Sequence, residues 1–168
     1  MKARARLLAV LLAAGAAAPA SATPPSEGSV RGAFLERCGG CHGIDGKSVA
    51  ALVPDLRDQV GYFLCTSEGR AYIPRLPNVA FSGVSDRRLA EIINYAVFEM
   101  GGASAPAGAK RYTAAEVGRL RRAPLTATDL TARRARVADA VIARCPAASG
   151  LRTYTMRAAQ SADRGVSP

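Results

Sequence analysis

One short motif limits the fold of this chain more than any other feature. Residues 36–48 read ERCGGCHGIDGKS, and within them Cys38, Cys41 and His42 form a Cys-x-x-Cys-His, with His42 the only histidine in 168 residues. Two thiols separated by two residues can reach the two vinyl groups on one edge of a porphyrin, and the adjacent imidazole can then bind the iron. The motif therefore predicts one covalently attached haem c per chain, with His42 as an axial ligand.

Other uses of these residues fit the sequence less well. A thioredoxin-like Cys-x-x-Cys would follow a strand and open a helix in an α/β fold, and no such pattern surrounds residues 38–41. A structural zinc ion would need Cys65 and Cys145 nearby, although neither belongs to a second Cys-x-x-Cys. A chance occurrence of the motif in an unrelated exported chain is a third alternative. Haem would also stabilise a small domain, because a domain of roughly 80 residues buries little apolar surface and usually needs a cofactor, a metal or disulfides.

The first 22 residues have the three parts of a secretory signal peptide. MKARAR is basic, LLAVLLAAGAAA is apolar, and Ala20-Ser21-Ala22 is a small-x-small cleavage pattern. The apolar run is too short to cross ~30 Å of hydrocarbon, and no later stretch approaches ~20 apolar residues. We therefore expect cleavage after Ala22, export to the periplasm and no membrane span in the mature chain. A membrane anchor is the alternative.

Export would place the four cysteines where disulfides persist. If Cys38 and Cys41 carry haem, Cys65 and Cys145 form a natural pair. That bond would close a loop spanning 80 residues and pin the last helix onto the haem domain. Two separate thiols are the alternative.

Positive charge is concentrated in the C-terminal part. The formal net charge is +10, and cleavage would remove Lys2, Arg4 and Arg6, which leaves 10 − 3 = +7. From Lys110 onward there are eleven arginines and one lysine against four acidic residues. A basic exported protein favours acidic partners. Nucleic acid is not an expected partner, because the aromatic residues are few and do not alternate with the basic ones.

Helical patterns dominate, and no segment has the pattern of a strand. RGAFLERC predicts a short helix, and SDRRLAEIINYAVFEM begins at a good N-cap, Ser85, and repeats apolar residues at helical spacing. A capping box at Thr113 and Glu116 opens a later helix after the linker GGASAPAG, and DLTARRARVADAVIAR predicts the last one. We expect an all-α fold, with a cytochrome c-like haem domain over residues 23–102 and a basic helical extension over residues 103–168.

Three segments are predicted to be less regular. Gly69 is a plausible C-terminal cap that would end a short helix or turn. PRLPNVAFSGVS reads as an extended loop because of Pro74 and Pro77. The tail from Pro146 is predicted to be loose.

The segment from Val30 to Met100 resembles class I cytochromes c in its stretches FLERCGGCHG, VPDL and SDRRLAEIINYAVF. The family has an aromatic residue four positions before the first cysteine, matched by Phe34, and another near the middle of the final helix, matched by Tyr95. Val30 stands where the family usually has glycine, which implies a looser or shifted helix crossing. Residues 103–168 lie outside the resemblance.

The resemblance also implies roles around the haem. In the family a proline carbonyl after the histidine accepts a hydrogen bond from the proximal imidazole, and Pro54 stands at that place. A ligating histidine normally donates its second N–H in this way, which supports the assignment independently. Arg70 and Arg75 flank the region where the family's propionates lie and would pair with them. Ordinary solvated arginines are the alternative.

The second axial ligand of the iron is less determined. The family usually supplies a methionine from a loop just before the final helix, but here Leu76 stands before Pro77 and the loop contains no methionine. Met100 follows the final helix, beside a Gly-Gly pair that gives its backbone freedom to turn inward. We expect Met100 as the ligand, with an open or water-bound iron, or Met156, as alternatives.

These features imply an electron-transfer protein and not an enzyme. A periplasmic mono-haem cytochrome would carry single electrons between a donor and an acceptor, and small exported cytochromes of this type often serve amine or alcohol dehydrogenases. The expected partner is a redox protein with an acidic surface. One alternative is a haem protein whose open distal site binds a gas or another small ligand. Another is a structural subunit that tethers a haem to a larger complex.

Overall fold

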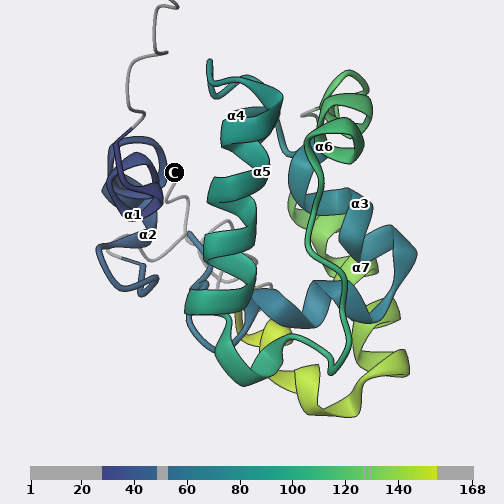
Figure 1. The fold of residues 1–168 in the computed structure, drawn as a ribbon. Coiled ribbons are helices and arrows are strands. Elements are labelled where there is room, and N and C mark those ends of the chain that lie inside the picture. Colours follow the sequence, from purple (N-terminus) through teal and green to yellow (C-terminus); the bar gives the residue numbers. More distant parts are fainter. Residues whose placement is uncertain (1–27, 49–52, 127, 129, 155–168) are drawn as a thin grey trace, which may run out of the picture.

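The computed structural model describes residues 28–48, 53–126, 128 and 130–154, and every regular element in that part of the chain is a helix (Figure 1). The all-α prediction is therefore confirmed. Within the same residues, no helix combines the length and apolar character that a membrane span requires. The expected signal peptide and Met156 lie outside the described residues.

The Cys-x-x-Cys-His motif lies on the first helical segment. Helix α1 (Val30–Phe34) continues through the wider turns of η1 (Leu35–Gly39) into α2 (Gly40–His42). The hydroxyl of Ser29 caps the start by accepting a hydrogen bond from a backbone N–H of the first turn. The segment ends at Gly43, whose φ of +70° is accessible to glycine without steric cost.

Helix α5 (Asp86–Asn94), which continues into η3 (Tyr95–Met100), packs across this first segment. Ser85 caps α5 as predicted, because its hydroxyl accepts a hydrogen bond from a first-turn N–H. The apolar face, at helical spacing and at most 3% exposed, consists of Leu89, Ile92, Ile93 and Val97. Phe34 is fully buried at the crossing, with its ring centroid 5.6 Å from that of Tyr95. This contact positions the haem motif relative to α5.

The prediction that a helix or turn ends at Gly69 is wrong, and the predicted extended loop is wrong for residues 74–80, most of which are helical. Helix α3 (Ser67–Arg75) begins after Thr66, whose hydroxyl accepts a hydrogen bond from the N–H of Gly69. Gly69 therefore lies in the first turn of a helix and does not end one. Helix α4 (Pro77–Ala80) follows almost directly, because a proline in the first turn lacks only an N–H that would have had no helical partner.

Pro74 is accommodated inside α3 by a residue from the C-terminal part. Proline has no N–H for the carbonyl four residues earlier, which is that of Arg70. That carbonyl instead accepts a hydrogen bond from the hydroxyl of Tyr112 at 2.8 Å. Tyr112 is only 3% exposed. The regular shape of α3 therefore depends on a long-range contact.

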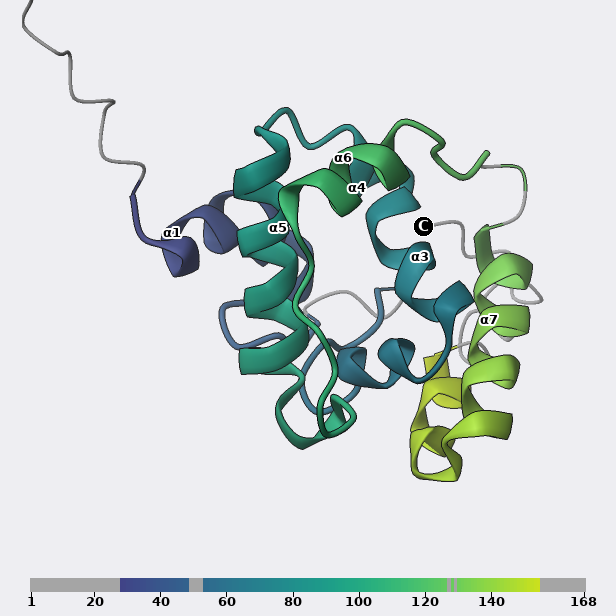
Figure 2. The same cartoon turned by 45° about the vertical axis from the view of Figure 1, so that its right-hand side comes forward.

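The basic C-terminal part packs into the same interior as the helices before it. Its elements are η4 (Gly102–Ser104), α6 (Ala114–Arg121), α7 (Leu130–Arg144) and η6 (Pro146–Gly150). Helix α6 lies against α5 and α3, and α7 lies on the side of α3 that faces away from α5 (Figure 2). Val117 of α6 is buried with the apolar residues of α5, whereas Val137 and Val141 of α7 are buried with Phe63 and Tyr72. Residues from the predicted haem domain and from the predicted extension are thus buried together in two hydrophobic clusters.

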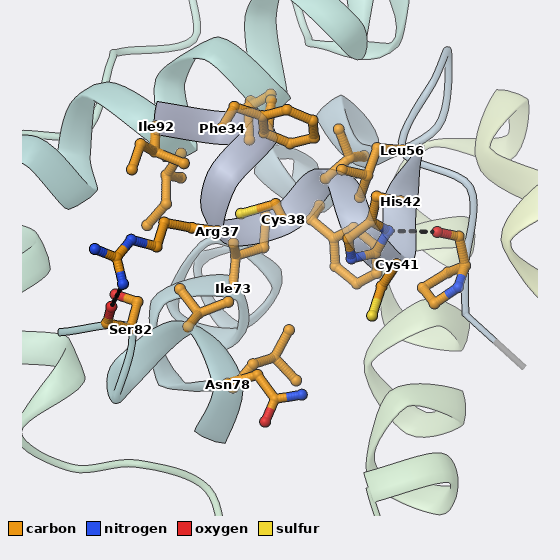
Figure 3. Close-up of a pocket in the computed structure, with 18 of the residues that line it drawn as sticks. Phe34, Arg37, Cys38, Cys41, His42, Leu56, Ile73, Asn78, Ser82 and Ile92 are labelled. Atoms are coloured by element: carbon orange, nitrogen blue, oxygen red, sulfur yellow. Dashed lines mark hydrogen bonds between the residues drawn. The ribbon is translucent and has the colours of Figure 1, made fainter. Parts of the chain in front are cut away.

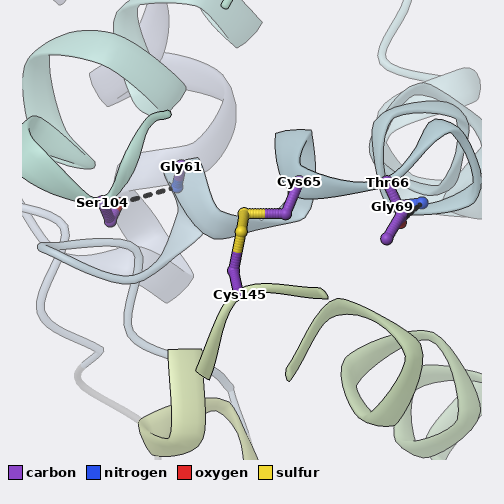
Figure 4. The surroundings of a disulfide bond; sticks show 6 residues. All are labelled: Gly61, Cys65, Thr66, Gly69, Ser104 and Cys145. Atoms are coloured by element: carbon purple, nitrogen blue, oxygen red, sulfur yellow. Dashed lines mark hydrogen bonds between the residues drawn. A yellow bond between two sulfur atoms is a disulfide. The ribbon is translucent and has the colours of Figure 1, made fainter. Parts of the chain in front are cut away.

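A disulfide joins Cys65, at the end of η2 (Val60–Cys65), to Cys145, just after α7 (Figure 4). The predicted pairing is confirmed. The chain after this bond buries Ala148 and Leu151. The prediction of a loose tail is therefore wrong up to residue 154, because the disulfide and these two apolar side chains hold it against η2 and α7.

Replacing Cys65 and Cys145 together by alanine should destabilise the protein strongly. The bond joins residues 80 positions apart. Without it the unfolded chain gains conformational entropy, which lowers the free energy of unfolding by about 3–5 kcal/mol. Urea denaturation measures the change as a lower midpoint. Cys145→Ala alone should lower the free energy of unfolding about as much as the double variant does, because either change removes the disulfide. A loss below about 1 kcal/mol would contradict this role.

Candidate functional site

A cleft lies between the N-terminal helical segment and helices α3, α4 and α5, with α7 along one edge (Figure 3). The cleft is open to solvent, and its empty space, including the solvent at the mouth, is about 1080 Å³. The walls are mainly apolar. Their apolar and aromatic side chains include Phe34, Leu56, Phe63, Tyr72, Leu89 and Ile92. The lining suits a mainly apolar ligand.

Cys38, Cys41 and His42 all line this cleft. Both cysteines are free, with Cys38 partly buried and Cys41 exposed. Burial, and to a lesser degree the neighbouring Cys41 thiol, raises the pKa of Cys38 to about 11. Cys38 is therefore an uncharged thiol at neutral pH. Two free thiols and one imidazole at the same cavity are the attachment groups that a c-type haem uses.

The alternative of a four-cysteine zinc site is wrong for this structure. Cys65 and Cys145 are bonded to each other, so they supply no thiolate for a metal. Across the described part of the chain, no three His, Cys, Asp or Glu side chains gather as a metal-binding group.

His42 is held by a hydrogen bond from its Nδ1–H to the carbonyl oxygen of Pro54, with an N···O distance of 3.0 Å (dashed line in Figure 3). A carbonyl can only accept, so Nδ1 carries the proton and the Nε2 lone pair remains for a metal. Burial lowers the pKa of His42, although the hydrogen bond to Pro54 opposes this shift. The imidazole is therefore neutral at pH 7, the form that binds iron.

The loop that presents Pro54 is tied to the chain just after His42. The carbonyl of Gly46 accepts hydrogen bonds from the N–H groups of Leu56 and Arg57, at 2.8 and 3.0 Å. Gly46 has a φ of +75°, and a Cβ there would lie 3.3 Å from the Arg57 nitrogen. Glycine is thus required at this close approach, which fixes the Pro54 carbonyl relative to the imidazole.

The segment before α5, where the resemblance led us to look for a methionine ligand, lines the cleft with other side chains. They are Leu76, Asn78, Val79 and Ser82, of which Asn78 and Ser82 are labelled in Figure 3. Among the described residues that line the cleft there is no methionine, and His42 is the only imidazole. No strong second axial ligand for iron is therefore placed on this wall.

Met100, the expected second ligand, lies outside the cleft. It is only 4% exposed and packs with Phe34, and its sulfur lies beside Gly46. The glycine after it, Gly101, is also closely packed, because a Cβ there would collide with the carbonyl of Val97. The structure therefore does not bring Met100 and His42 together, and Gly101 shows no room for the expected inward turn.

Arg70 and Arg75 also lie outside the cleft lining, where both bind the C-terminal part. Arg70 donates from Nε and Nη2 to the two carboxylate oxygens of Glu116, at 2.6 and 2.7 Å. Arg75 donates from Nε to the carbonyl of Ala123 at 2.6 Å. Thr113 caps α6 as predicted, because its hydroxyl accepts a hydrogen bond from the N–H of Glu116. The carboxylate of Glu116, which was the other half of the predicted capping box, binds Arg70 instead.

Two arginines that the sequence reasoning missed do line the cleft, Arg37 and Arg134. Arg134 comes from α7 and is only 7% exposed. A signal for it exists in the sequence, because Arg134, Val137 and Val141 follow the i, i+3, i+7 spacing of one helical face. Arg134 thus occupies the apolar side of α7, where a charged residue is unusual.

Comparisons with protein families, curated proteins and solved structures each found no match. The resemblance to class I cytochromes c therefore rests on the residues of this chain alone.

Glu116→Gln should destabilise the protein by about 1–2 kcal/mol at pH 7, because it leaves the partly buried Arg70 without its charged partner. The hydrogen bond to Arg70 is the main cause that lowers the pKa of Glu116. The stabilisation is therefore complete above the usual Glu pKa of about 4.3 and is lost as pH falls through the lower folded value. Denaturation curves should show the difference from wild type shrinking below about pH 4.

Glu99→Gln is the matched control. The ion pair of Glu99 with Arg111 is 3.2 Å long, but both side chains are more than half exposed. Such pairs contribute about 0.2–1 kcal/mol. Equal losses of stability in Glu116→Gln and Glu99→Gln would contradict a structural role for the pair between Arg70 and Glu116.

Proposed function

We propose that this chain is an exported mono-haem c-type cytochrome that carries single electrons between a periplasmic donor and an acceptor. The observation that carries the proposal is the convergence of Cys38, Cys41 and His42 on one mainly apolar cleft, with the His42 ring oriented by the Pro54 carbonyl. In this proposal the protein is not an enzyme, because no side chain performs covalent chemistry on a substrate.

The residues of the cleft fit a covalent haem. Cys38 and Cys41 would hold it through thioether bonds, and His42 would bind the iron through Nε2 while Pro54 fixes its ring. A haem bound there supplies a ferric–ferrous couple. The chain would attach and orient the group and surround it with apolar side chains, of which Phe34 and Val97 are fully buried. Such a shell restricts water, which is one of the means by which a protein tunes a haem potential.

An exported location is proposed from the N-terminal sequence. The disulfide between Cys65 and Cys145 supports it, because such bonds persist in oxidising compartments. The C-terminal part also carries exposed arginines: Arg111, Arg119, Arg122, Arg136, Arg144 and Arg152. We propose a redox partner with an acidic surface, and a periplasmic amine or alcohol dehydrogenase would be such a donor.

A second candidate function is the binding of a gas or another small ligand at the iron. The packing of Met100 outside the cleft favours it. The wall formed by Leu76, Asn78, Val79 and Ser82 contains no sulfur or imidazole. An iron with water or no ligand on its second axial side would take up carbon monoxide.

Haem attachment tests the proposal. In a host that matures Cys-x-x-Cys-His cytochromes, wild-type protein should keep its haem after acid–acetone extraction, and the Cys38→Ala, Cys41→Ala variant should lose it. The control is Cys65→Ala, Cys145→Ala, which also removes two cysteines but should keep haem. Extractable haem, or none, in the wild type would overturn the proposal. A reversible one-electron transition of the attached haem would support electron transfer.

Met100→Leu tests whether the Met100 thioether is the second axial ligand. Leucine fills nearly the same volume in the core, so the change removes the sulfur with little effect on packing. We expect no iron–sulfur(Met) charge-transfer band in the wild-type ferric spectrum, and the same spectrum in the variant. A band that disappears in Met100→Leu would show that this thioether reaches the iron. Carbon monoxide then separates the two functions: uptake by the ferrous protein supports ligand binding, and resistance supports electron transfer alone.

A further inference from the structure

The guanidinium of Arg134 lies where two cavities meet. One is the cleft that contains Cys38, Cys41 and His42, and the other is a smaller pocket between the Pro54 loop and the chain after the disulfide. Both are lined by Pro54, Asp55 and Arg134. Helix α7 therefore places a buried cation at the end of the cleft beside the Pro54 loop.

The protein surrounds this cation with aromatic side chains. The guanidinium carbon lies 5.2 Å from the ring centroid of Phe63 and 4.8 Å from that of Tyr154, and the side chain of Tyr72 lies near enough to interact with its charge. Burial lowers the pKa of Arg134, but a guanidinium remains charged in proteins. Ring contacts offset part of the cost of burying it.

A carboxylate partner is missing among the described residues. Arg70 pairs with Glu116, Arg121 with Asp86 and Arg133 with Glu68. None of the ion pairs between described residues includes Arg134, and its Nε has no hydrogen-bond partner there. A buried charge without a counter-ion costs several kcal/mol. The most buried of these arginines is thus the one that lacks an anion.

The smaller pocket contains a second buried polar atom without a partner. Oε1 of Gln59 forms no hydrogen bond with the described residues. The oxygen and nitrogen of an amide are interchangeable by a simple flip, so this side chain can present a donor to the same pocket. Arg134 thus gives the mainly apolar cleft a buried cation at one end, and Gln59 adds a polar group to the adjoining pocket.

We propose that Arg134 forms an ion pair with a carboxylate of the cofactor that Cys38, Cys41 and His42 hold. The inference rests on the proposed function, since a haem carries two propionate carboxylates on an otherwise mainly apolar ring. A planar guanidinium matches a carboxylate in geometry and charge. Arg134 takes the role that the resemblance assigned to Arg70 and Arg75. The C-terminal part is then part of the cofactor site as well as of the core.

The reduction potential reports on this contact. A positive charge beside the haem favours the ferrous state, and removing it while the carboxylate remains favours the ferric state. If Arg134 only stacked on Phe63 and Tyr154, with no carboxylate beside it, its substitution would change mainly the stability of the fold and the potential far less. Redox titration therefore separates the two roles.

The experiment compares Arg134→Gln and Arg134→Met with wild type, each with covalent haem. We expect each variant to shift the ferric–ferrous equilibrium about tenfold toward ferric, which lowers the midpoint potential by about 59 mV. The Met variant fills similar volume without a charge, so it carries the test if the Gln variant does not fold. Arg136→Gln, an exposed change of equal charge on the same helix, is the control and should shift the equilibrium less than about twofold.

Attached haem with unchanged potentials in both Arg134 variants would overturn the inference. So would an equal shift in Arg136→Gln, since the effect would then follow net charge alone. Wild-type protein without covalent haem would instead refute the proposed function, and this inference would fall with it.

Discussion

The hydrogen bond from His42 Nδ1 to the Pro54 carbonyl is the interaction on which the rest of the site depends. The chain contains one histidine, so only this imidazole can bind iron, and only an acceptor at Nδ1 leaves Nε2 for the metal. The structure fixes both partners. Gly46 ties the Pro54 loop to the chain after the motif, and Phe34 anchors the motif helix against Tyr95 of η3.

Residues of the C-terminal part form hydrogen bonds with the helices that line the cleft. Tyr112 satisfies the carbonyl that Pro74 leaves without a donor, and α3 can therefore remain helical along the cleft. Arg121 donates to the carbonyls of Ala80 and Val84, both at 2.8 Å, which ties α6 to the segment between α4 and α5. Several arginines that total charge alone would assign to a partner surface thus stabilise the fold.

Local signals were sufficient for much of the fold. The caps at Ser85 and Thr113 and the spacing of α5 follow from neighbouring residues, and the disulfide pairing follows from the use of Cys38 and Cys41 by the motif. Residues set by long-range contacts were less predictable. The helical state of Pro74 depends on Tyr112, and Arg70 binds Glu116, which lies 46 residues away. Arg134 was detectable only from its position on the apolar face of α7. The resemblance to class I cytochromes c could not locate it, because it ends before residue 103.

The single histidine permits a direct test of the central claim, that His42 is an iron ligand oriented by Pro54. Haem-loaded protein labelled only with ¹⁵N-histidine has one imidazole to observe by NMR. The account predicts a protonated Nδ1 and an Nε2 signal shifted strongly by the ferric iron, both independent of pH between about 5 and 8, where a free histidine titrates. An unshifted imidazole that titrates near its usual pKa of about 6.5 would contradict it.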